Sequence, residues 1–555
     1  MLSPSALRAR LLPAAVVGSI VAVVVLALPV VWWSPLNVDE ELTLRIAQFS
    51  FGHIFHVVST QRGGGPLHFW FEGALQSLWP GLPALRIPSL IFLCLALPAV
   101  AIVARQLVGD EVAAAVVLLT AVSPIPVQYA TFGRPHTLLF AWLMWGTVLV
   151  LRAARDGDRR LWIAGGAALG LTVFVHPTAP LYALTAFGVA LIYAPQPVRE
   201  LVRTAWPGAA ALLVTSLPYY ATTLHVLGDR YGVGNGNART FDGKPVWEDA
   251  LHFVAPGAHD LNVFTGLAAA GVVVLVCARR WRLLLFCALT VAAPVVFFSV
   301  VPASGDSALF FDRYMIPVTP AFLILVVWAC AWVARWAGPF RVGVFALLVA
   351  GLFAIEVHHD VNRRNQIHSL ALSTATHAVA YEAQGSVLFG STGTAGSAWT
   401  SFDYGHPANL FGHYVALRVS VPYWPDDSCA RIAPFVESGT ATHGIWLFYT
   451  SDPEDAAAAA KAFAPVASVT VERPTSRIFV VRSAAALPPR VLVALGLKLR
   501  SAWQIAVPMN TRVDELIAAD REALAEPRAC PTYPSKDELG DPGTSPHWPP
   551  VKQRQ

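Results

Sequence analysis

The chain has 555 residues, of which 55 % are hydrophobic and only 13 % are charged. Soluble domains carry about a quarter charged residues, so this composition excludes an ordinary soluble protein. The net charge of +4 is small for this length, and no basic segment with interleaved aromatic residues indicates a nucleic-acid partner.

The first long apolar run covers residues 11–33 and follows Arg8 and Arg10. A cleaved signal peptide also starts with basic residues, but its apolar core spans only about 7–15 residues. This run is longer and ends in Trp32 and Trp33, and tryptophan is typical of the membrane–water interface. We therefore predict a retained first membrane span.

Apolar runs that approach the length of a membrane helix, about 20 residues, continue as far as residue 357. They predict a polytopic α-helical membrane protein with about eleven transmembrane helices in residues 1–357. The expected spans are 11–33, 86–107, 112–127, 135–151, 161–175, 178–194, 204–224, 260–278, 283–302, 315–334 and 341–357.

Arginine in the short loops predicts the orientation, because cytoplasmic loops hold the excess of Lys and Arg. The Arg-rich loops alternate along the chain and contain Arg152, Arg155, Arg159, Arg160, Arg199, Arg203, Arg279, Arg280, Arg282, Arg335 and Arg341. This pattern predicts a cytoplasmic N-terminus. With an odd number of spans, the C-terminal region is then extracytoplasmic, as are the segments 34–85, 225–259 and 303–314.

Charged residues return from about residue 358, together with short β-prone segments at 386–389, 444–449, 468–471 and 478–481 and a helix-forming segment at 453–463. The pattern predicts an extracytoplasmic α/β domain over 358–527 that could bind a glycan. Within it, 488–525 reads as one or two helices, and 528–555 as a disordered tail. Cys429 and Cys530 could pair in an oxidising compartment, and the sequence leaves this open.

Asp39 and Glu40 follow the first span by a few residues, near the outer membrane surface. A carboxylate there can act as a general base on an acceptor hydroxyl, and nearby lipid and a second acid would raise its pKa. The alternative is a pair of solvated acids that opens an interfacial helix. Both interpretations stay open.

Arg134 and His136 lie at the outer end of the expected span 135–151, and Arg313 and Tyr314 lie at the outer end of the expected span 315–334. An arginine at the membrane surface can bind a lipid phosphate through two parallel hydrogen bonds, or it can be a snorkelling anchor. We favour phosphate binding for Arg313 and leave Arg134 open. His176 opens an outer turn, where it could bond a sugar or be structural.

Several enzyme classes lack their motifs: the sequence has no P-loop, no HExxH, no zinc-type Cys/His spacing and no Gly-x-Ser-x-Gly. The predicted spans contain almost no ionisable residue, whereas transporters place such residues at mid-membrane. A transporter or lipid flippase with an outer cap domain is thus the less favoured alternative, beside a non-catalytic scaffold.

Four segments carry a resemblance to a known family: Asn37-Val38-Asp39-Glu40, Gly65-Pro66-Leu67-His68-Phe69-Trp70, Arg134-Pro135-His136, and the Arg-Tyr-x-x-Pro-x-x-Pro segment at 313–320. In this order they resemble the C-type (GT-C) superfamily of membrane glycosyltransferases over residues 1–340, in particular the protein O-mannosyltransferase and aminoarabinose transferase group. The region after 358 is similar to that of actinobacterial cell-wall glycosyltransferases, including arabinofuranosyltransferases, with an extracellular C-terminal domain.

The resemblance implies an inverting transferase of the mannosyl or arabinofuranosyl type in a bacterial plasma membrane, with a polyprenyl-phosphate sugar as donor and a glycan, lipid or protein as acceptor. Asp39 would be the base and Glu40 its supporting acid. Arg313 and Arg134 would hold the donor phosphate, which leaves already charged and needs cations more than a general acid. The substrate-binding candidates are His68, His136, His176 and Tyr314. His68 replaces the Tyr usual in the family. An acidic pair can hold a divalent cation, but no second ligand set is evident.

Overall fold

The structure is a computed structural model. It describes residues 4–33, 40, 43, 46–47, 49–62, 65–78, 82–231, 236–237, 239–240, 245–249, 260–303, 309–310, 312–369, 387–392, 436–441, 443–449, 469–472, 478–483, 485–491 and 514. The chain divides into two compact units. The helical unit comprises Met1–Pro29, Ser50–Glu72 and Arg86–Asn362, and the second unit comprises Val30–Phe49, Gly73–Leu85 and Arg363–Gln555.

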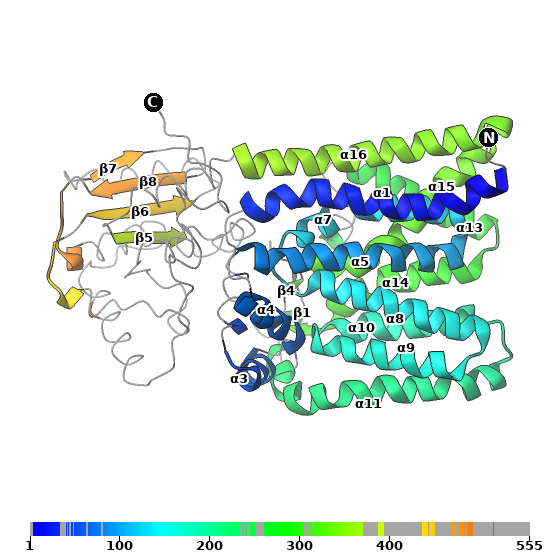
Figure 1. The fold of residues 1–555 in the computed structure, drawn as a ribbon, viewed down its shortest axis with the longest axis horizontal. Coiled ribbons are helices and arrows are strands. Elements are labelled where there is room, and N and C mark those ends of the chain that lie inside the picture. Colours follow the sequence, from blue (N-terminus) through cyan, green and yellow to red (C-terminus); the bar gives the residue numbers. More distant parts are fainter. Residues whose placement is uncertain are drawn as a thin grey trace. The chain divides into compact units, whose positions relative to one another are not determined.

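Long apolar helices run roughly parallel to one another in the helical unit (Figure 1). They are α1 (Pro4–Trp33), α5 (Leu82–Val108), α6 (Asp110–Val122), α8 (His136–Asp156), α9 (Arg159–Leu171), α10 (Ala179–Tyr193), α11 (Val198–Tyr231), α13 (Asp260–Cys277), α14 (Trp281–Val300), α15 (Thr319–Arg335) and α16 (Arg341–Ser369). Shorter helical segments are α3 (Phe51–His56), the π-helix η1 (Val57–Arg62), α4 (Pro66–Leu78), α7 (Pro124–Ala130), η2 (Thr172–Phe174), α12 (Val246–Asp249), η4 (Asp312–Val318) and η5 (Gly338–Phe340).

Each expected span coincides with a helix, and the third coincides with two. α6 and α7 are bent by 54° at Ser123, where Pro124 lacks the N–H that would continue the helix. Six helices in the described part of the chain are long and apolar enough to cross a membrane, and the bent pair can make a seventh. The protein is therefore a polytopic helical membrane protein, and the figure of about eleven spans stays a prediction.

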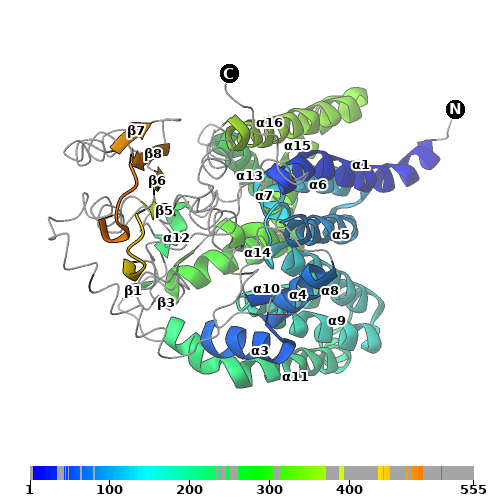
Figure 2. The same ribbon diagram turned by 60° about the vertical axis from the view of Figure 1, so that its left-hand side comes forward.

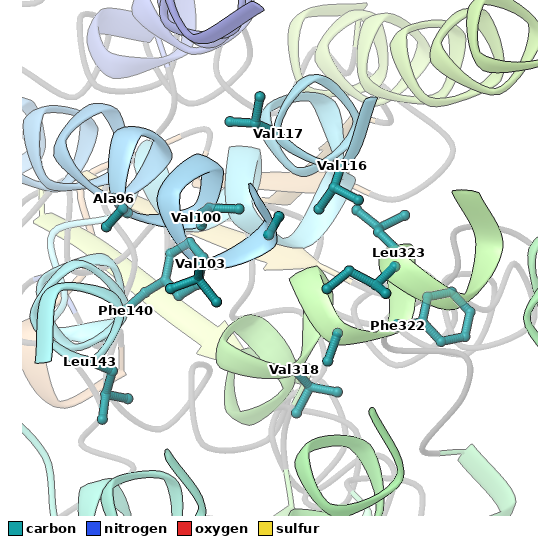
Figure 3. Packing of buried hydrophobic residues seen from close by; sticks show 14 of the residues in the cluster. Ala96, Val100, Val103, Val116, Val117, Phe140, Leu143, Val318, Phe322 and Leu323 are labelled. Atoms are coloured by element: carbon teal, nitrogen blue, oxygen red, sulfur yellow. The ribbon is translucent and has the colours of Figure 1, made fainter. Parts of the chain in front are cut away.

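The interior is packed with aliphatic and aromatic side chains from α5, α6, α8 and α15 (Figure 3). Val103, Val116, Phe140 and Phe322, for example, are all buried in one continuous cluster. Large apolar side chains also cover the outside, and Leu347 is 73 % exposed. An apolar exterior over an apolar core is what lipid contact requires, and it agrees with the membrane assignment.

Glycines bring two helix pairs into backbone contact. A Cβ on Gly166 or Gly170 of α9 would overlap the backbone of Gly208 or Leu212 in α11, and one on Gly271 of α13 would overlap the backbone of Leu325 in α15. Lipid supplies no hydrophobic force between helices, so membrane helices associate by such close packing at small residues.

Two short strand pairs join segments that are distant in sequence, and Figure 2 shows the strands β1 and β3 of the first pair. β1 (Gly236–Asn237) pairs antiparallel with β3 (Pro302–Ala303), and β2 (Arg239–Thr240) pairs parallel with β4 (Leu309–Phe310). The segments 225–259 and 303–314 were predicted to share one side of the membrane, and these pairs place them together.

The second unit contains a four-stranded sheet of order β5-β6-β8-β7. Its strands are β5 (Val387–Thr392), β6 (Gly444–Tyr449), β7 (Val469–Glu472) and β8 (Ile478–Ser483). β5 and β6 are parallel, and the other pairs are antiparallel. All four β-prone segments thus overlap strands. The helix expected at 453–463, most of 488–525, the tail, Cys429 and Cys530 lie outside the described residues.

Candidate active site

Three aromatic side chains from separate segments form a column inside the helical unit. The ring centroids of His136 and His176 are 5.4 Å apart, and those of His176 and Tyr314 are 5.8 Å apart. His136 is the first residue of α8, His176 lies in the turn before α10, and Tyr314 lies in η4 before α15. The fold therefore brings three predicted site residues together where three helices begin.

Further aromatic rings fix both ends of this column. Tyr129 of α7 packs edge-on against His136 at 5.1 Å, and Phe298 of α14 stacks on Tyr314 at 5.1 Å with an interplanar angle of 5°. The Tyr182 hydroxyl of α10 donates a hydrogen bond to the Tyr314 carbonyl. Tyr129, Phe298 and Tyr182 are buried, so the column has little freedom to move.

The turn that follows His176 determines the tautomer of its ring. The backbone N–H of Thr178 donates to His176 Nδ1 at 3.3 Å, and the Thr178 hydroxyl lies 2.8 Å from the same nitrogen. A nitrogen that accepts a backbone N–H carries no proton. The proton of neutral His176 therefore sits on Nε2.

His68 is buried in α4, with only 1 % of its surface exposed. Its Nε2 lies 3.3 Å from the carbonyl oxygen of Gly133, which can only accept, so Nε2 carries the proton. Burial, and next the charge of Arg134, lower the pKa of His68 to about 3, although the Gly133 contact opposes this. His68 is therefore neutral at physiological pH, and its Nδ1 has no hydrogen-bond partner within the described residues.

Arg134 and Arg313 supply permanent positive charge beside the column. The Arg313 guanidinium lies 5.9 Å from the centre of the Tyr314 ring. Both arginines, like His68 and His176, are near enough to His136 to act on its ring electrostatically. Both are partly buried, where a charge acts more strongly than in open water. The cluster therefore suits an anionic group.

The predicted acids cannot be placed against this cluster. Asp39, the candidate base, lies outside the described residues, and Glu40 belongs to the second unit, where it is 1 % exposed. Within the described part of the chain, no three His, Cys, Asp or Glu side chains converge in a way that could hold a metal ion.

Several buried polar residues were not predicted from the sequence. Glu72, Arg86 and Glu356 are completely buried, and Ser89 is 1 % exposed. Arg86 and Glu356 lie within two of the apolar helices, so the expectation of almost no ionisable residue in the spans was too strong. Arg86 and Glu356 lie at the ends of the expected spans 86–107 and 341–357, where sequence alone suggests membrane-surface residues. Burying a charge in an apolar membrane helix is costly, so an ionisable residue inside an apolar run is a signal that could have identified Arg86 and Glu356.

Comparison with known proteins gives one family match. Residues 64–220 match the family of dolichyl-phosphate-mannose-protein mannosyltransferases. This range contains His68, Arg134, His136 and His176, and it ends before Arg313 and Tyr314. A search of curated proteins found no match.

Solved structures of membrane glycosyltransferases align with the chain at low identity. ArnT from Cupriavidus metallidurans, bound to undecaprenyl phosphate, has a TM-score of 0.49 and 17 % identity, over 83 % of this chain and 96 % of that one. The Archaeoglobus fulgidus oligosaccharyltransferase in complex with Zn and sulfate has a TM-score of 0.43 and 14 % identity, over 81 % and 69 %. The archaeal oligosaccharyltransferase AglB from the same organism, with an inhibitory peptide and a dolichol-phosphate, has a TM-score of 0.43 and 12 % identity, over 84 % and 74 %. The family match over residues 64–220 confirms, for that part of the chain, the resemblance to C-type membrane glycosyltransferases.

Proposed function

We propose that the protein is an inverting glycosyltransferase that moves a sugar from a polyprenyl-phosphate donor to an acceptor hydroxyl at the outer face of the membrane. The observation that carries the proposal is the pair of arginines, Arg134 and Arg313, beside the buried column of His136, His176 and Tyr314. The cluster lies largely within the part of the chain that matches the mannosyltransferase family.

The helix ends at the cluster also favour an anion. α8 begins at His136, α10 begins at Ala179 just after His176, and η4 with Tyr314 leads into α15 at Thr319. Unpaired backbone N–H groups give a helix N-terminus a partial positive charge. Together with the guanidinium groups, these ends provide a positive field for the donor phosphate.

In the proposed reaction, Asp39 removes the proton of the acceptor hydroxyl while Glu40 supports it. The acceptor oxygen then forms a bond to the anomeric carbon as the bond from that carbon to the phosphate oxygen breaks. The bonding pair leaves on the phosphate, so the departing polyprenyl phosphate gains a negative charge. Arg313 and Arg134 offset this charge where it develops, which is the usual largest contribution to such catalysis. A single displacement inverts the anomeric centre.

The substrate and the setting follow from the family resemblance. We assign a mannosyl- or arabinofuranosyl-type transfer in cell-wall or envelope glycan assembly, with a glycan, lipid or protein acceptor. The membrane domain takes residues 1–357, and an extracytoplasmic α/β domain takes 358–527 before the tail 528–555. We also propose about eleven spans, from the apolar runs, and a cytoplasmic N-terminus, from the loop arginines. The bacterial plasma membrane is proposed from the resemblance.

One observation favours the alternative of a transporter or lipid flippase. Arg86 and Glu356 are buried inside apolar helices, and ionisable groups inside membrane helices often line transport pathways. A purified protein that moves labelled polyprenyl phosphate across vesicle membranes without transferring sugar would support this alternative. A protein that does neither would be a scaffold.

The test of the proposal is sugar transfer by the purified protein from radiolabelled polyprenyl-phosphate mannose and polyprenyl-phosphate arabinofuranose. Arg313→Ala should raise the donor KM about 10- to 100-fold, because hydrogen bonds to charged groups contribute about 1.5–3 kcal/mol. Arg313→Lys should recover only part of this, since lysine cannot make two parallel bonds.

The matched control is Arg199→Ala, which removes an exposed arginine from the start of α11 and should leave transfer unchanged. Transfer that is equally fast in Arg313→Ala would contradict the phosphate role of Arg313. The absence of transfer from every polyprenyl-phosphate sugar by the wild type would contradict the proposed function.

A further inference from the structure

The turn that carries Arg134 is held by side chains from two other helices. The Ser89 hydroxyl of α5 lies 2.7 Å from the Phe132 carbonyl oxygen and 3.4 Å from that of Arg134. His68 Nε2 of α4 lies 3.3 Å from the Gly133 carbonyl oxygen. Three consecutive carbonyl groups of one turn are therefore bonded by two side chains that are distant in sequence.

Ser89 differs from two buried threonines of other helices. Thr120 of α6 and Thr147 of α8 each donate to the carbonyl four residues earlier in their own helix, as is usual for Ser and Thr inside helices. The Ser89 hydroxyl instead reaches the turn before α8 and leaves its own helix. A serine hydroxyl that only bonded a carbonyl of its own helix would not reach this turn.

His68 is suited to the same task because its protonation state is fixed. Burial keeps the ring neutral, and the Gly133 carbonyl requires the proton on Nε2. A carbonyl cannot donate, so this bond does not switch direction as pH changes. The turn is also closed internally, since Arg134 N–H donates to the Phe132 carbonyl at 2.7 Å.

We propose that Ser89 and His68 are positioning residues that hold the turn at 132–134 so that Arg134 meets the phosphate of the lipid-borne donor. This inference rests on the proposed function in its use of Arg134. It assigns a role to Ser89, and it gives His68 a task on the protein backbone in place of direct substrate binding. An arginine side chain has large rotamer freedom, so a fixed backbone beneath it reduces what must be ordered when the anion binds.

The first test measures donor KM, kcat and the Kd for a fluorescent polyprenyl phosphate without sugar. Ser89→Ala should raise KM and Kd about tenfold and change kcat less, while Ser89→Thr, which keeps the hydroxyl, should stay within about threefold of wild type. The matched control is Thr147→Val in α8, which removes a buried hydroxyl that bonds its own helix. This change should leave KM and Kd unchanged.

A double-mutant cycle separates positioning from a general structural role. If Ser89 acts through Arg134, then Ser89→Ala should have no further effect on Kd once Arg134→Ala is present. A tenfold effect that persists in the Arg134→Ala background would overturn the inference, as would an unchanged Kd in Ser89→Ala alone.

Two substitutions of His68 test which ring nitrogen matters. The amide nitrogen of Gln can take the place of Nε2, whereas that of Asn lies nearer Nδ1. His68→Gln should keep the wild-type Kd, and His68→Asn should weaken it about as much as Ser89→Ala does. The opposite order would show that Nδ1 contacts the substrate and would overturn the assignment of His68.

The lipid-binding measurement also keeps this inference separate from the proposed function. Binding of polyprenyl phosphate that depends on the Ser89–Arg134 coupling, with no sugar transfer at all, would support the positioning role and contradict the transferase. If the protein transfers sugar but the effects of Ser89→Ala and Arg134→Ala on Kd are additive, the positioning role is contradicted and the proposed function is not.

Discussion

His68, His136 and His176 come from three separate segments, and their surroundings give each ring a different hydrogen-bonding state. His68 donates through Nε2 to a backbone carbonyl, and His176 accepts through Nδ1 from a backbone N–H. His136 Nε2 is buried and meets no hydrogen-bond partner in the described part of the protein. His136 Nε2, like His68 Nδ1, is therefore a buried ring nitrogen that a sugar hydroxyl could bond.

The lowered pKa of His68 predicts a dependence of stability on pH. In the unfolded chain the ring binds a proton near pH 6.5, but in the folded protein it does so only near 3. As pH falls below 6.5 the unfolded state gains protons that the folded state does not, so stability is lost progressively down to about pH 3. Each pH unit in this window lowers the free energy of unfolding by up to about 1.4 kcal/mol.

The measurement is thermal unfolding in detergent between pH 7.5 and 5, for the wild type and His68→Gln. The variant lacks the titrating group, so its melting temperature should fall less on acidification. An equal decline in both proteins would show that His68 is not the group responsible.

At the scale of elements, α4 is set against the turn before His176 by Gly65. A Cβ at this position would overlap the backbone of Phe174 and Val175, so the chain can approach the turn only because Gly65 has no side chain. Pro66 then starts α4, with His68 in its first turn. The contact thus couples the placement of His68 to that of His176.

Gly65→Ala should therefore destabilise the protein by about 1–3 kcal/mol, the usual cost of overpacking, and reduce sugar transfer because the turn that holds His176 must shift. Gly52→Ala in α3 is the control, since a Cβ there meets nothing within 4 Å. Thermal unfolding and initial transfer rates measure both effects. Unchanged stability in Gly65→Ala would contradict the close backbone approach.

The sequence predicted the helices better than their breaks. Apolar length locates each membrane helix, because lipid contact selects for it directly. The 54° bend between α6 and α7 was missed, although Pro124 offered a signal, because the apolar run continues through it. α11 extends over Val198–Tyr231 beyond the expected 204–224, since its charged ends do not look like membrane helix.

At the scale of the whole molecule, residues far apart in the chain meet at one cluster. His68 and Tyr314 are separated by most of the membrane domain in sequence, and helix packing brings His68 near His136 and Tyr314 near His176. The family motifs pointed to His68, Arg134, His136, Arg313 and Tyr314 individually, without relating them in space. The bonds of Ser89 to the turn could not be predicted, because nothing in a sequence shows that a helical serine will leave its own helix.

The protein combines an exposed apolar surface with a partly buried pair of arginines, Arg134 and Arg313. In the proposed function, the apolar exterior would contact the polyprenyl chain, and the two arginines beside the aromatic column would bind its phosphate. The proposed general base, Asp39, is assigned from its position after the first span and from the family resemblance. That assignment makes Asp39 the sharpest point at which to test the whole proposal.

The most direct measurement compares wild type and Asp39→Asn in single-turnover transfer from a radiolabelled polyprenyl-phosphate sugar, with binding of polyprenyl phosphate measured alongside. We predict that transfer falls at least about 100-fold, the lower range for loss of a general base, while lipid-phosphate binding stays within a few-fold of wild type. Transfer at the wild-type rate in Asp39→Asn would contradict the proposed mechanism.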